Sequence, residues 1–426
     1  MTGGSGNNPA RPSVSRRAFL GTLGGASAGA LIGASGMQGD EADGARHGGP
    51  SWESVPFFGA HQAGIVTPPQ CHSTFLALDV IAQRREEVAE LLRMLTDLGA
   101  SLTQGHESPG GSARDDADAD ETLGLGPARL TVNIGLGPSM FAPGSSDRFG
   151  LAKSRPIALV DLPPFPGDEL EPGRTGGDLS VHVCADDAQV VFHAVRRITR
   201  SVAGAAAVRW SQSGFREAGA SCGTPRNLMG FKDGTMNPST AFALSEWVWV
   251  AVPVPAWMVG GTYVVVRRIR MDLDRWDDVT ADEQEGIIGR HKVSGAPLGC
   301  AAEFDPLDLA ARRSDGELRI PEDAHVRIAS PSANWNNGML RRSYSFAEDA
   351  VGASGALGES TGSMEAGLFF VAYQSWPRLA FIPIYGNLAR RDALRHFTTH
   401  TGSTVAAIPP GAPAPGRWIG QQLFEG

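Results

Sequence analysis

The sequence predicts an α+β protein with antiparallel sheets. Several short segments have the β-branched and aromatic residues, or the apolar–polar alternation, of strands, and others have apolar residues at helical spacing. The two kinds of segment do not alternate strictly, as they would in a parallel α/β sheet. The composition of the 426 residues, 42% hydrophobic and 19% charged, is that of a globular protein with a large core.

The first half of the ordered chain is predicted over residues 51–223. Val88, Leu91 and Leu95 recur at helical spacing, and Asp186 is placed to cap a second helix. The stretch 107–122 is acidic and rich in Gly, Ser and Asp, so we expect a solvated loop there. The expected elements are a helix over Glu86–Leu98, a strand over Leu130–Ile134, a helix from Asp186 to about Arg200, and a strand over Val208–Ser213.

The second half is predicted over residues 224–426. Its strand candidates are rich in the residues that favour a pleated, half-buried surface. The 54 glycines and 29 prolines of the chain imply many loops between elements. The expected elements are strands over Trp247–Val252 and Thr262–Ile269, a helix over Trp276–Gly289, a strand over Leu368–Gln374, and a final helix over Arg390–Thr399.

Residues 1–50 are predicted to be an export signal and a disordered leader. Ser15-Arg16-Arg17 precedes a weakly apolar stretch, rich in Gly and Ala, that continues to about Met37. Twin arginines before a mild apolar region are typical of Tat signals, although an Arg-Arg pair before a disordered tail can also arise by chance. We therefore expect export by the Tat pathway to the periplasm, the cell surface or the medium. Tat substrates cross the membrane folded, which suits a protein that takes up its cofactor in the cytoplasm.

The remaining bulk properties exclude other classes. No other segment has 18 consecutive apolar residues, so we expect no stable membrane span in the mature chain. The net charge of −9 argues against nucleic acid as a partner. The four cysteines show no Cys-x-x-Cys spacing and no zinc-type pairing with histidine. They fit buried or free thiols, and one disulfide stays open if the protein is exported.

The sequence Gly230-Phe231-Lys232-Asp233-Gly234-Thr235 places an acidic side chain in a glycine-flanked turn. Asp233 is there either to form the turn or to react from a rigid backbone, and an Asp-Gly pair alone fits both. His325 and Arg341 follow in the chain. An acid, a histidine and an arginine in this order indicate a haem peroxidase, because neutral imidazole is a common axial haem ligand. His325 alone would also fit an ordinary hydrogen-bonded histidine.

Motifs of competing enzyme classes are absent from the sequence or lie in an unsuitable context. It contains no His-Glu-x-x-His, no Cys-x-x-Cys-His, and no Walker or Rossmann glycine loop. Gly-x-Ser-x-Gly occurs only at 25–29, in the predicted leader, and at 358–362, in a stretch rich in Gly and Ser, and neither follows a predicted strand as a nucleophile elbow would. A zinc hydrolase, a c-type haem protein, a serine hydrolase and a nucleotide enzyme are therefore poorly supported.

From about Val55 to the C-terminus the chain resembles the dye-decolourising peroxidase family, and within it the exported deferrochelatase/peroxidases. The blocks that carry this resemblance are Phe57–Ile65, Leu102–Gly105, Gly230–Thr235, Gly289–Arg290, Gly295–Gly299, His325–Arg327, Leu340–Tyr344 and Gly367–Phe370. The resemblance implies two ferredoxin-like halves with antiparallel β-sheets and peripheral helices. It also implies that haem b (iron protoporphyrin IX) binds in the C-terminal half.

The family's site residues carry over to matching positions here. The resemblance implies that His325 is the proximal ligand of the haem iron, Asp233 the distal acid and Arg341 the distal arginine. It places Arg327 near a haem propionate, and Asp392 on the free nitrogen of His325. The other cofactor-binding residues that it implies are Gly234, Thr235, Met236, Ser330, Pro331, Ser332, Leu368 and Phe370.

One block departs from the family. Ala329-Ser330-Pro331-Ser332 stands where the family often has Ala-Asn-Pro-Arg. An arginine is missing there, which leaves the propionate contacts on that side in question.

The implied mechanism is a proton relay. Asp233 takes a proton from one peroxide oxygen and returns it to the other, while Arg341 stabilises the negative charge on the leaving oxygen. Free aspartate titrates near about pH 3.9, far below histidine, so this role predicts an acidic optimum. Large dyes cannot enter an apolar distal pocket. Electrons could then pass through Trp335, Tyr344 or Trp376, each of which also fits simple packing.

Two function classes stay open at this point. One is an enzyme that reduces hydrogen peroxide and oxidises organic compounds or ferrous iron, with release of iron from intact haem as a second activity. The other is a non-catalytic haem- or iron-binding component of an uptake system. Expected partners are a small reductant, iron-uptake permease components and further copies of the chain. Chlorite dismutase relatives are disfavoured by the Gly-x-x-Asp-Gly turn.

Overall fold

The computed structural model describes residues 53–105, 125–217, 223–253, 255–349 and 364–425. The predicted Tat signal at residues 1–50, the predicted loop at 107–122 and one of the four cysteines, Cys222, lie outside them. Within the described ranges no helix is both long and apolar enough to cross a membrane.

The N-terminal half is a four-stranded antiparallel sheet with two helices. Its strand order is β2-β3-β1-β4, and the chain runs strand–helix–strand–strand–helix–strand, which is the ferredoxin-like arrangement implied by the resemblance. The elements are β1 (His72–Val80), α1 (Arg85–Thr103), β2 (Thr131–Leu136), β3 (Leu179–Ala185), α3 (Ala188–Ser201) and β4 (Ala206–Phe215).

The helices of this half pack by the apolar faces seen in the sequence. Val88, Leu91 and Leu95 of α1 are buried in the main core cluster. The cap of α3 differs from the prediction by one residue, because the Asp187 carboxylate accepts the amide protons of Gln189 and Val190. Asp186 instead forms an ion pair of 3.0 Å with Arg129. The prediction was therefore wrong about the capping residue and right about the helix.

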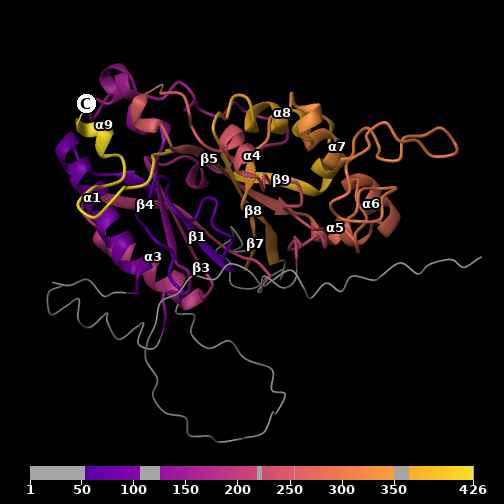
Figure 1. Cartoon of the computed structure of the whole chain (residues 1–426), viewed down its shortest axis with the longest axis horizontal. Helices are drawn as coiled ribbons and strands as arrows, with labels where there is room; N and C mark the ends of the chain where they lie inside the picture. The colour runs from indigo at the N-terminus through magenta and orange to yellow at the C-terminus, as the bar shows by residue number, and fades with distance from the viewer. Residues whose placement is uncertain (1–52, 106–124, 218–222, 254, 350–363, 426) are drawn as a thin grey trace, which may run out of the picture. The chain divides into compact units, whose positions relative to one another are not determined.

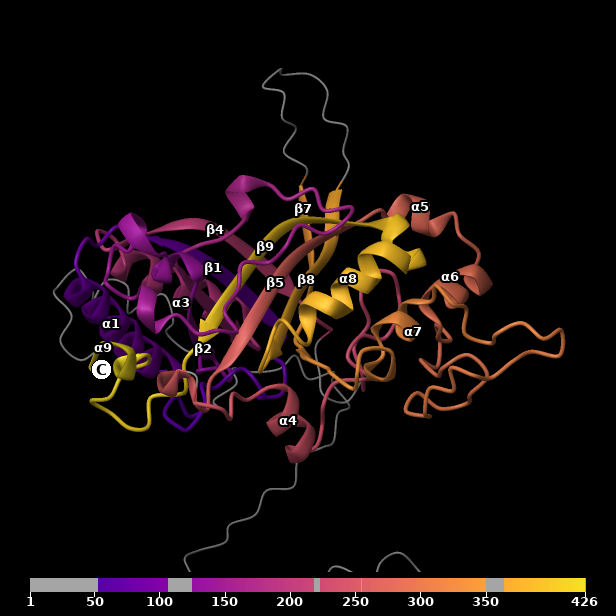
Figure 2. The ribbon, with the colours of Figure 1, turned by 90° about the horizontal axis from the view of Figure 1, so that it is seen from above.

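The C-terminal half repeats the same plan. Its sheet has the order β9-β5-β8-β7, with β6 on the same edge of β8 as β7. The strands are β5 (Thr262–Met271), β6 (Leu340–Arg341), β7 (Tyr344–Asp349), β8 (Met364–Gln374) and β9 (Thr398–Ile408). The helices are α4 (Ala241–Trp247), α5 (Leu273–Asp277), α6 (Ala281–Ile288), α7 (His325–Ala329), α8 (Phe381–Arg391) and α9 (Gln421–Glu425). Figure 2 shows α8 alongside β8, with α7 next to it.

The two sheets join at both edges. Leu136 of β2 pairs with Ala407 of β9, and Phe215 of β4 pairs with Ser345 of β7. Since β5 also pairs with β8, the strands close into a ring. A second core cluster, which includes Phe75, Trp210, Val264 and Phe369, draws its residues from the strands of both halves. The described residues from 53 onward accordingly belong to one compact unit, and the division of the chain at 223/224 stays a prediction.

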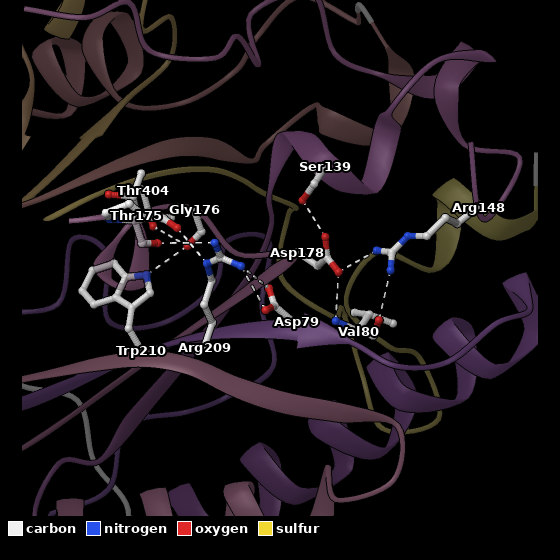
Figure 3. A network of polar contacts seen from close by, with 11 residues as sticks. Asp79, Val80, Ser139, Arg148, Thr175, Gly176, Asp178, Arg209, Trp210 and Thr404 are labelled. Atoms are coloured by element: carbon white, nitrogen blue, oxygen red, sulfur yellow. Dashed lines mark hydrogen bonds and ion pairs between the residues drawn. The ribbon is translucent and has the colours of Figure 1, made fainter. Parts of the chain in front are cut away.

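A loop before β3 adds polar contacts between the halves (Figure 3). The carbonyl oxygen of Gly176 accepts hydrogen bonds from the Trp210 indole of β4 at 3.0 Å and the Thr404 hydroxyl of β9 at 2.8 Å. Two residues later, the buried Asp178 carboxylate accepts from the Arg148 guanidinium and from the Val80 amide. These contacts fix the loop where strands of both halves meet.

Three predicted elements of the second half were wrong. Trp247–Val252 is no strand, because α4 ends at Trp247 and the amides of Val248 and Trp249 still donate to Leu244 of that helix. Among the described residues that follow in this stretch, only Val250 exchanges backbone hydrogen bonds with another segment, at Gly260 and Gly261. Prolines 253 and 255 lack the amide protons that a ladder would need. Trp276–Gly289 contains two helices, since Thr280 caps a new one, α6. Arg390–Thr399 is not one α-helix, because it contains the last two residues of α8, the 3₁₀ helix η9 (Ala393–Phe397) and the first two residues of β9, Thr398 and Thr399, whose β-branched side chains favour a strand.

The other predicted elements agree with the structure. The helix over Glu86–Leu98 is α1, and the strands over Leu130–Ile134, Val208–Ser213, Thr262–Ile269 and Leu368–Gln374 are parts of β2, β4, β5 and β8. The α+β class with antiparallel sheets is therefore confirmed.

Candidate functional site

A cavity of about 490 Å³ lies in the C-terminal half. This volume is within the range of small-molecule and cofactor sites. Its wall is formed by the 229–236 turn, α7, α8 and β8, and most of the lining side chains are apolar. These include Met229, Phe231, Ile269, Met271, Ile288, Leu307, Leu368, Phe370, Phe381, Ile384 and Leu388.

The predicted site residues gather around this one cavity with two exceptions. His325, Asp233 and Arg341 all line it. So do Gly234, Thr235, Met236, Ser330, Pro331, Leu368, Phe370 and Asp392. Arg327 and Ser332 are not among the lining residues.

His325 is the first residue of the short helix α7, and its ring is held from behind by Asp392 at the end of α8. The Nδ1–Oδ2 distance is 2.6 Å, and the Asp392 side chain is only 5% exposed. The second carboxylate oxygen of Asp392 accepts the amide proton of Leu394 at 2.8 Å. Because a carboxylate only accepts, Nδ1 carries the ring proton, and the lone pair of Nε2 is available for a ligand.

Asp233 and Arg341 form the second polar feature of the cavity. Arg341 Nη1 lies 3.4 Å from Asp233 Oδ1, and both side chains are about one-quarter exposed. The backbone of Gly234 has a φ of 116°, a conformation that favours glycine and lets the chain turn directly after the acid. Asn237 holds Arg341 in place, since its amide group donates to the Arg341 carbonyl at 2.7 Å and accepts from the Arg341 amide at 3.0 Å.

Glu303 supports the turn that carries Asp233. Its carboxylate forms an ion pair with Lys232 and accepts the Thr235 hydroxyl at 3.0 Å, so it holds the residues on both sides of the acid. Burial raises the pKa of Glu303, but hydrogen bonds from Lys232, Thr224 and Thr235 outweigh this and lower it. Sequence reasoning missed Glu303, because an isolated acid in a loop carries no local pattern.

Arg290 supplies a buried cationic nitrogen in the cavity wall. Its Nη1 donates to the carbonyl oxygens of Gly295 at 2.7 Å and Glu303 at 2.9 Å. Its Nη2 is buried and has no hydrogen-bond partner among the described residues. A guanidinium nitrogen of this kind suits a carboxylate on a bound ligand. The residue lies in a block that carries the family resemblance, but the sequence alone gave it no role.

Arg327 has a different position from the one predicted. Its guanidinium donates to the carbonyl oxygens of Leu309, Ile320 and Pro321 at 2.7–3.1 Å. It therefore ties the loop before α7 to the helix instead of facing the cavity. Ser332 likewise turns to Ser330, with 3.1 Å between the two hydroxyl oxygens.

The three aromatic residues considered for electron transfer differ in exposure. Trp335 is 79% exposed, whereas Trp376 is half-buried and Tyr344 is buried. Trp335 also has a φ of 52°, an unusual value for a bulky residue. Of the three, Trp335 offers a large reductant the most exposed surface.

Comparison with known proteins gives consistent matches. Sequence models of the N-terminal and C-terminal parts of Dyp-type peroxidases match residues 62–216 and 224–413. A dye-decolorizing peroxidase of Thermobifida fusca is 41% identical over 384 residues, which cover 86% of this chain and 84% of that protein. A deferrochelatase of Yersinia pestis is 36% identical over 386 residues, which cover 88% and 86%.

Solved structures give the same picture. The oxyferrous complex of DtpA from Streptomyces lividans superposes with a TM-score of 0.79 at 41% identity, covering 87% of this chain and 98% of that one. A DyP-type peroxidase from Cellulomonas bogoriensis has the same TM-score at 38% identity, with 89% and 100% covered.

Proposed function

This chain belongs to the Dyp-type peroxidase family, and we propose that the cavity beside Asp233 is where it binds haem b and reduces hydrogen peroxide. It is a haem-dependent peroxidase, with a small organic compound or ferrous iron as the reductant. The observation that carries the assignment of the site is that His325, backed by Asp392, and the Asp233–Arg341 pair line one cavity.

The residues present fit a haem group. The apolar wall suits the porphyrin faces, and the available Nε2 of His325 suits the iron. The buried Arg290 Nη2 lacks a partner among the described residues, and a propionate carboxylate would give it one. This nitrogen offers a charged contact in place of the arginine that is missing at Ser332.

When bound, the haem iron supplies the site at which peroxide is held and the electrons that cleave its O–O bond. Asp233 moves the proton, because its carboxylate can take it from one peroxide oxygen and give it to the other. The Arg341 guanidinium, 3.4 Å from Asp233, places positive charge beside the oxygen that becomes negative. Glu303 fixes the turn that carries Asp233, through its hydrogen bond with Thr235. Asn237 fixes the backbone of Arg341.

Asp392 acts through His325. By accepting the Nδ1 proton at 2.6 Å it fixes the ring orientation and makes Nε2 a stronger donor to the metal. Its own orientation is fixed by the Leu394 amide.

Release of iron from intact haem is a second candidate activity. It is supported by relatives named deferrochelatase at 35–36% identity, and it would use the same cavity. Export by the Tat pathway to the periplasm or cell surface, an iron-uptake permease as partner and assembly into a homo-oligomer are also proposals, based on the sequence and the family.

The test replaces Asp233 by asparagine and Arg341 by leucine in the haem-loaded protein. We expect both variants to keep the Soret band and to lose peroxide turnover by about 10²-fold or more. Full turnover in both variants would exclude the Asp233–Arg341 pair from the reaction. Lost turnover with an unchanged iron-uptake phenotype would instead favour a haem- or iron-binding protein with incidental peroxidase chemistry. A rate that peaks near neutral pH and falls in acid, with haem still bound, would exclude Asp233 as the base.

A further inference from the structure

A second charged cluster lies away from the haem cavity, and it begins at Arg342. This side chain is only 1% exposed. Its Nη1 donates to the Thr67 carbonyl and its Nη2 to the Gln70 side-chain oxygen, and both acceptors are neutral. No described carboxylate forms an ion pair with it. Since a buried charge is costly without a counter-charge, the cluster should contain an anion.

Cys184 on β3 is the group that can supply this anion. Its side chain is fully buried, its Sγ lies 3.3 Å from His182 Nε2, and the Tyr344 hydroxyl donates to it at 3.4 Å. Burial raises the pKa of Cys184, but His182, Arg342 and Tyr344 together lower it to about 6. At neutral pH the thiolate therefore balances the Arg342 guanidinium.

Tyr344 connects this cluster with the haem site. Its ring is buried, and it lines a small hollow together with Asp233, Gly234 and Arg341. Leu368 lines both this hollow and the haem cavity. Burial raises the pKa of Tyr344 well above its ordinary value, so the phenol keeps its proton and donates it toward Cys184.

We propose that Tyr344 is an internal electron donor of the peroxidase and that the Cys184 thiolate is its proton acceptor. The inference rests on the proposed haem peroxidase function. Hydrogen peroxide, acting through the haem, is the oxidant. The phenol of Tyr344 loses one electron to the haem site, and its O–H proton moves to Cys184 Sγ, which becomes a thiol. An external reductant later returns the electron, and the proton moves back to the phenol oxygen.

The thiolate matters because it removes a barrier to this oxidation. A phenol that loses an electron but keeps its proton is a cation, and a cation beside the buried Arg342 and the half-buried Arg216 would be strongly disfavoured. Proton transfer over the existing 3.4 Å hydrogen bond avoids that species. Because Tyr344 is buried, it cannot touch a large reductant. It instead stores an oxidising equivalent away from the haem.

The experiment is freeze-quench electron paramagnetic resonance on the haem-loaded protein after peroxide. The chain has only four tyrosines, so the radical can be assigned by substitution. We expect a tyrosyl signal in the wild type, its loss in Tyr344→Phe, and its retention in the control Tyr263→Phe, whose buried hydroxyl has no described partner. We expect Cys184→Ala to form the radical at least tenfold more slowly. An unchanged signal in Tyr344→Phe, or an unchanged rate in Cys184→Ala, overturns the proposal.

Two further measurements distinguish a failure of the Tyr344 proposal from a failure of the peroxidase function. If Cys184→Ala does not fold, the rate of radical formation in the wild type is compared in water and deuterium oxide, and an equal rate overturns the proton transfer. The Soret band is followed in the same samples. No Soret change with peroxide in the wild type contradicts the peroxidase function itself, whereas a Soret change without a tyrosyl radical contradicts only the role of Tyr344.

Discussion

Replacing Cys184 by serine should remove a pH-dependent part of the folding stability. Burial raises the pKa of Cys184, but His182, Arg342 and Tyr344 lower it from its ordinary 9.0 to about 6 in the folded protein. A lowered pKa contributes stability that is complete above the unfolded value and is lost as the pH falls to the folded value. Each pH unit between the two adds about 1.4 kcal/mol, so the interval from pH 6 to pH 8 contributes about 3 kcal/mol.

The assay is urea unfolding of the wild type and Cys184→Ser at pH 5 and pH 8. The difference between the two proteins in unfolding free energy should grow by about 3 kcal/mol from the lower to the higher pH. Any pH-independent packing effect of the serine cancels in this comparison. The control is Cys300→Ser, at a half-buried position outside the cluster, for which no growth is expected. A difference that stays constant between the two pH values would refute a thiolate at Cys184.

Three further outcomes test the haem site. Asp233→Asn should bind haem normally and lower peroxide turnover by about 10²- to 10⁴-fold, and stopped-flow rates close to wild type would contradict the proton relay. Asp392→Asn should lower haem-iron affinity or activity by about 10- to 100-fold and shift the reduction potential, which a spectroelectrochemical titration measures; an unchanged potential would separate Asp392 from His325. Arg290→Met should weaken haem binding in a Soret titration, because it removes the buried Nη2, and equal affinity would mean that no propionate reaches it.

The fold was predictable where local pattern and tertiary structure agree. Helix α1 and strands such as β5 have the spacing or the β-branched content of their class. Trp247–Val252 has strand composition, but prolines follow it and no described strand pairs with it. Its structure therefore depends on the missing hydrogen-bond partners and not on its composition. The joining of the two sheets could not be read locally, because it depends on single pairs such as Leu136 with Ala407.

The site was predictable to a similar degree. Asp233, His325 and Arg341 lie in ordered sequence blocks, which let them be named together before any geometry was known. The role of Arg290 depends on one nitrogen without a described partner, and that of Cys184 on the guanidinium of Arg342, between β6 and β7. Such contacts join residues far apart in the chain, so the spacing of residues in the sequence does not predict them.

The closed ring of strands bears on how the protein can be divided. Each half pairs with the edge strands of the other half. Leu136 of β2 pairs with Ala407 of β9, and Phe215 of β4 pairs with Ser345 of β7. A fragment ending near residue 216 would leave β2 and β4 as unpaired edge strands and would expose Phe75 and Trp210 to solvent. Fragments made separately should therefore be prone to self-association, and co-expression should rescue them by complementation, with haem uptake returning only when both are present.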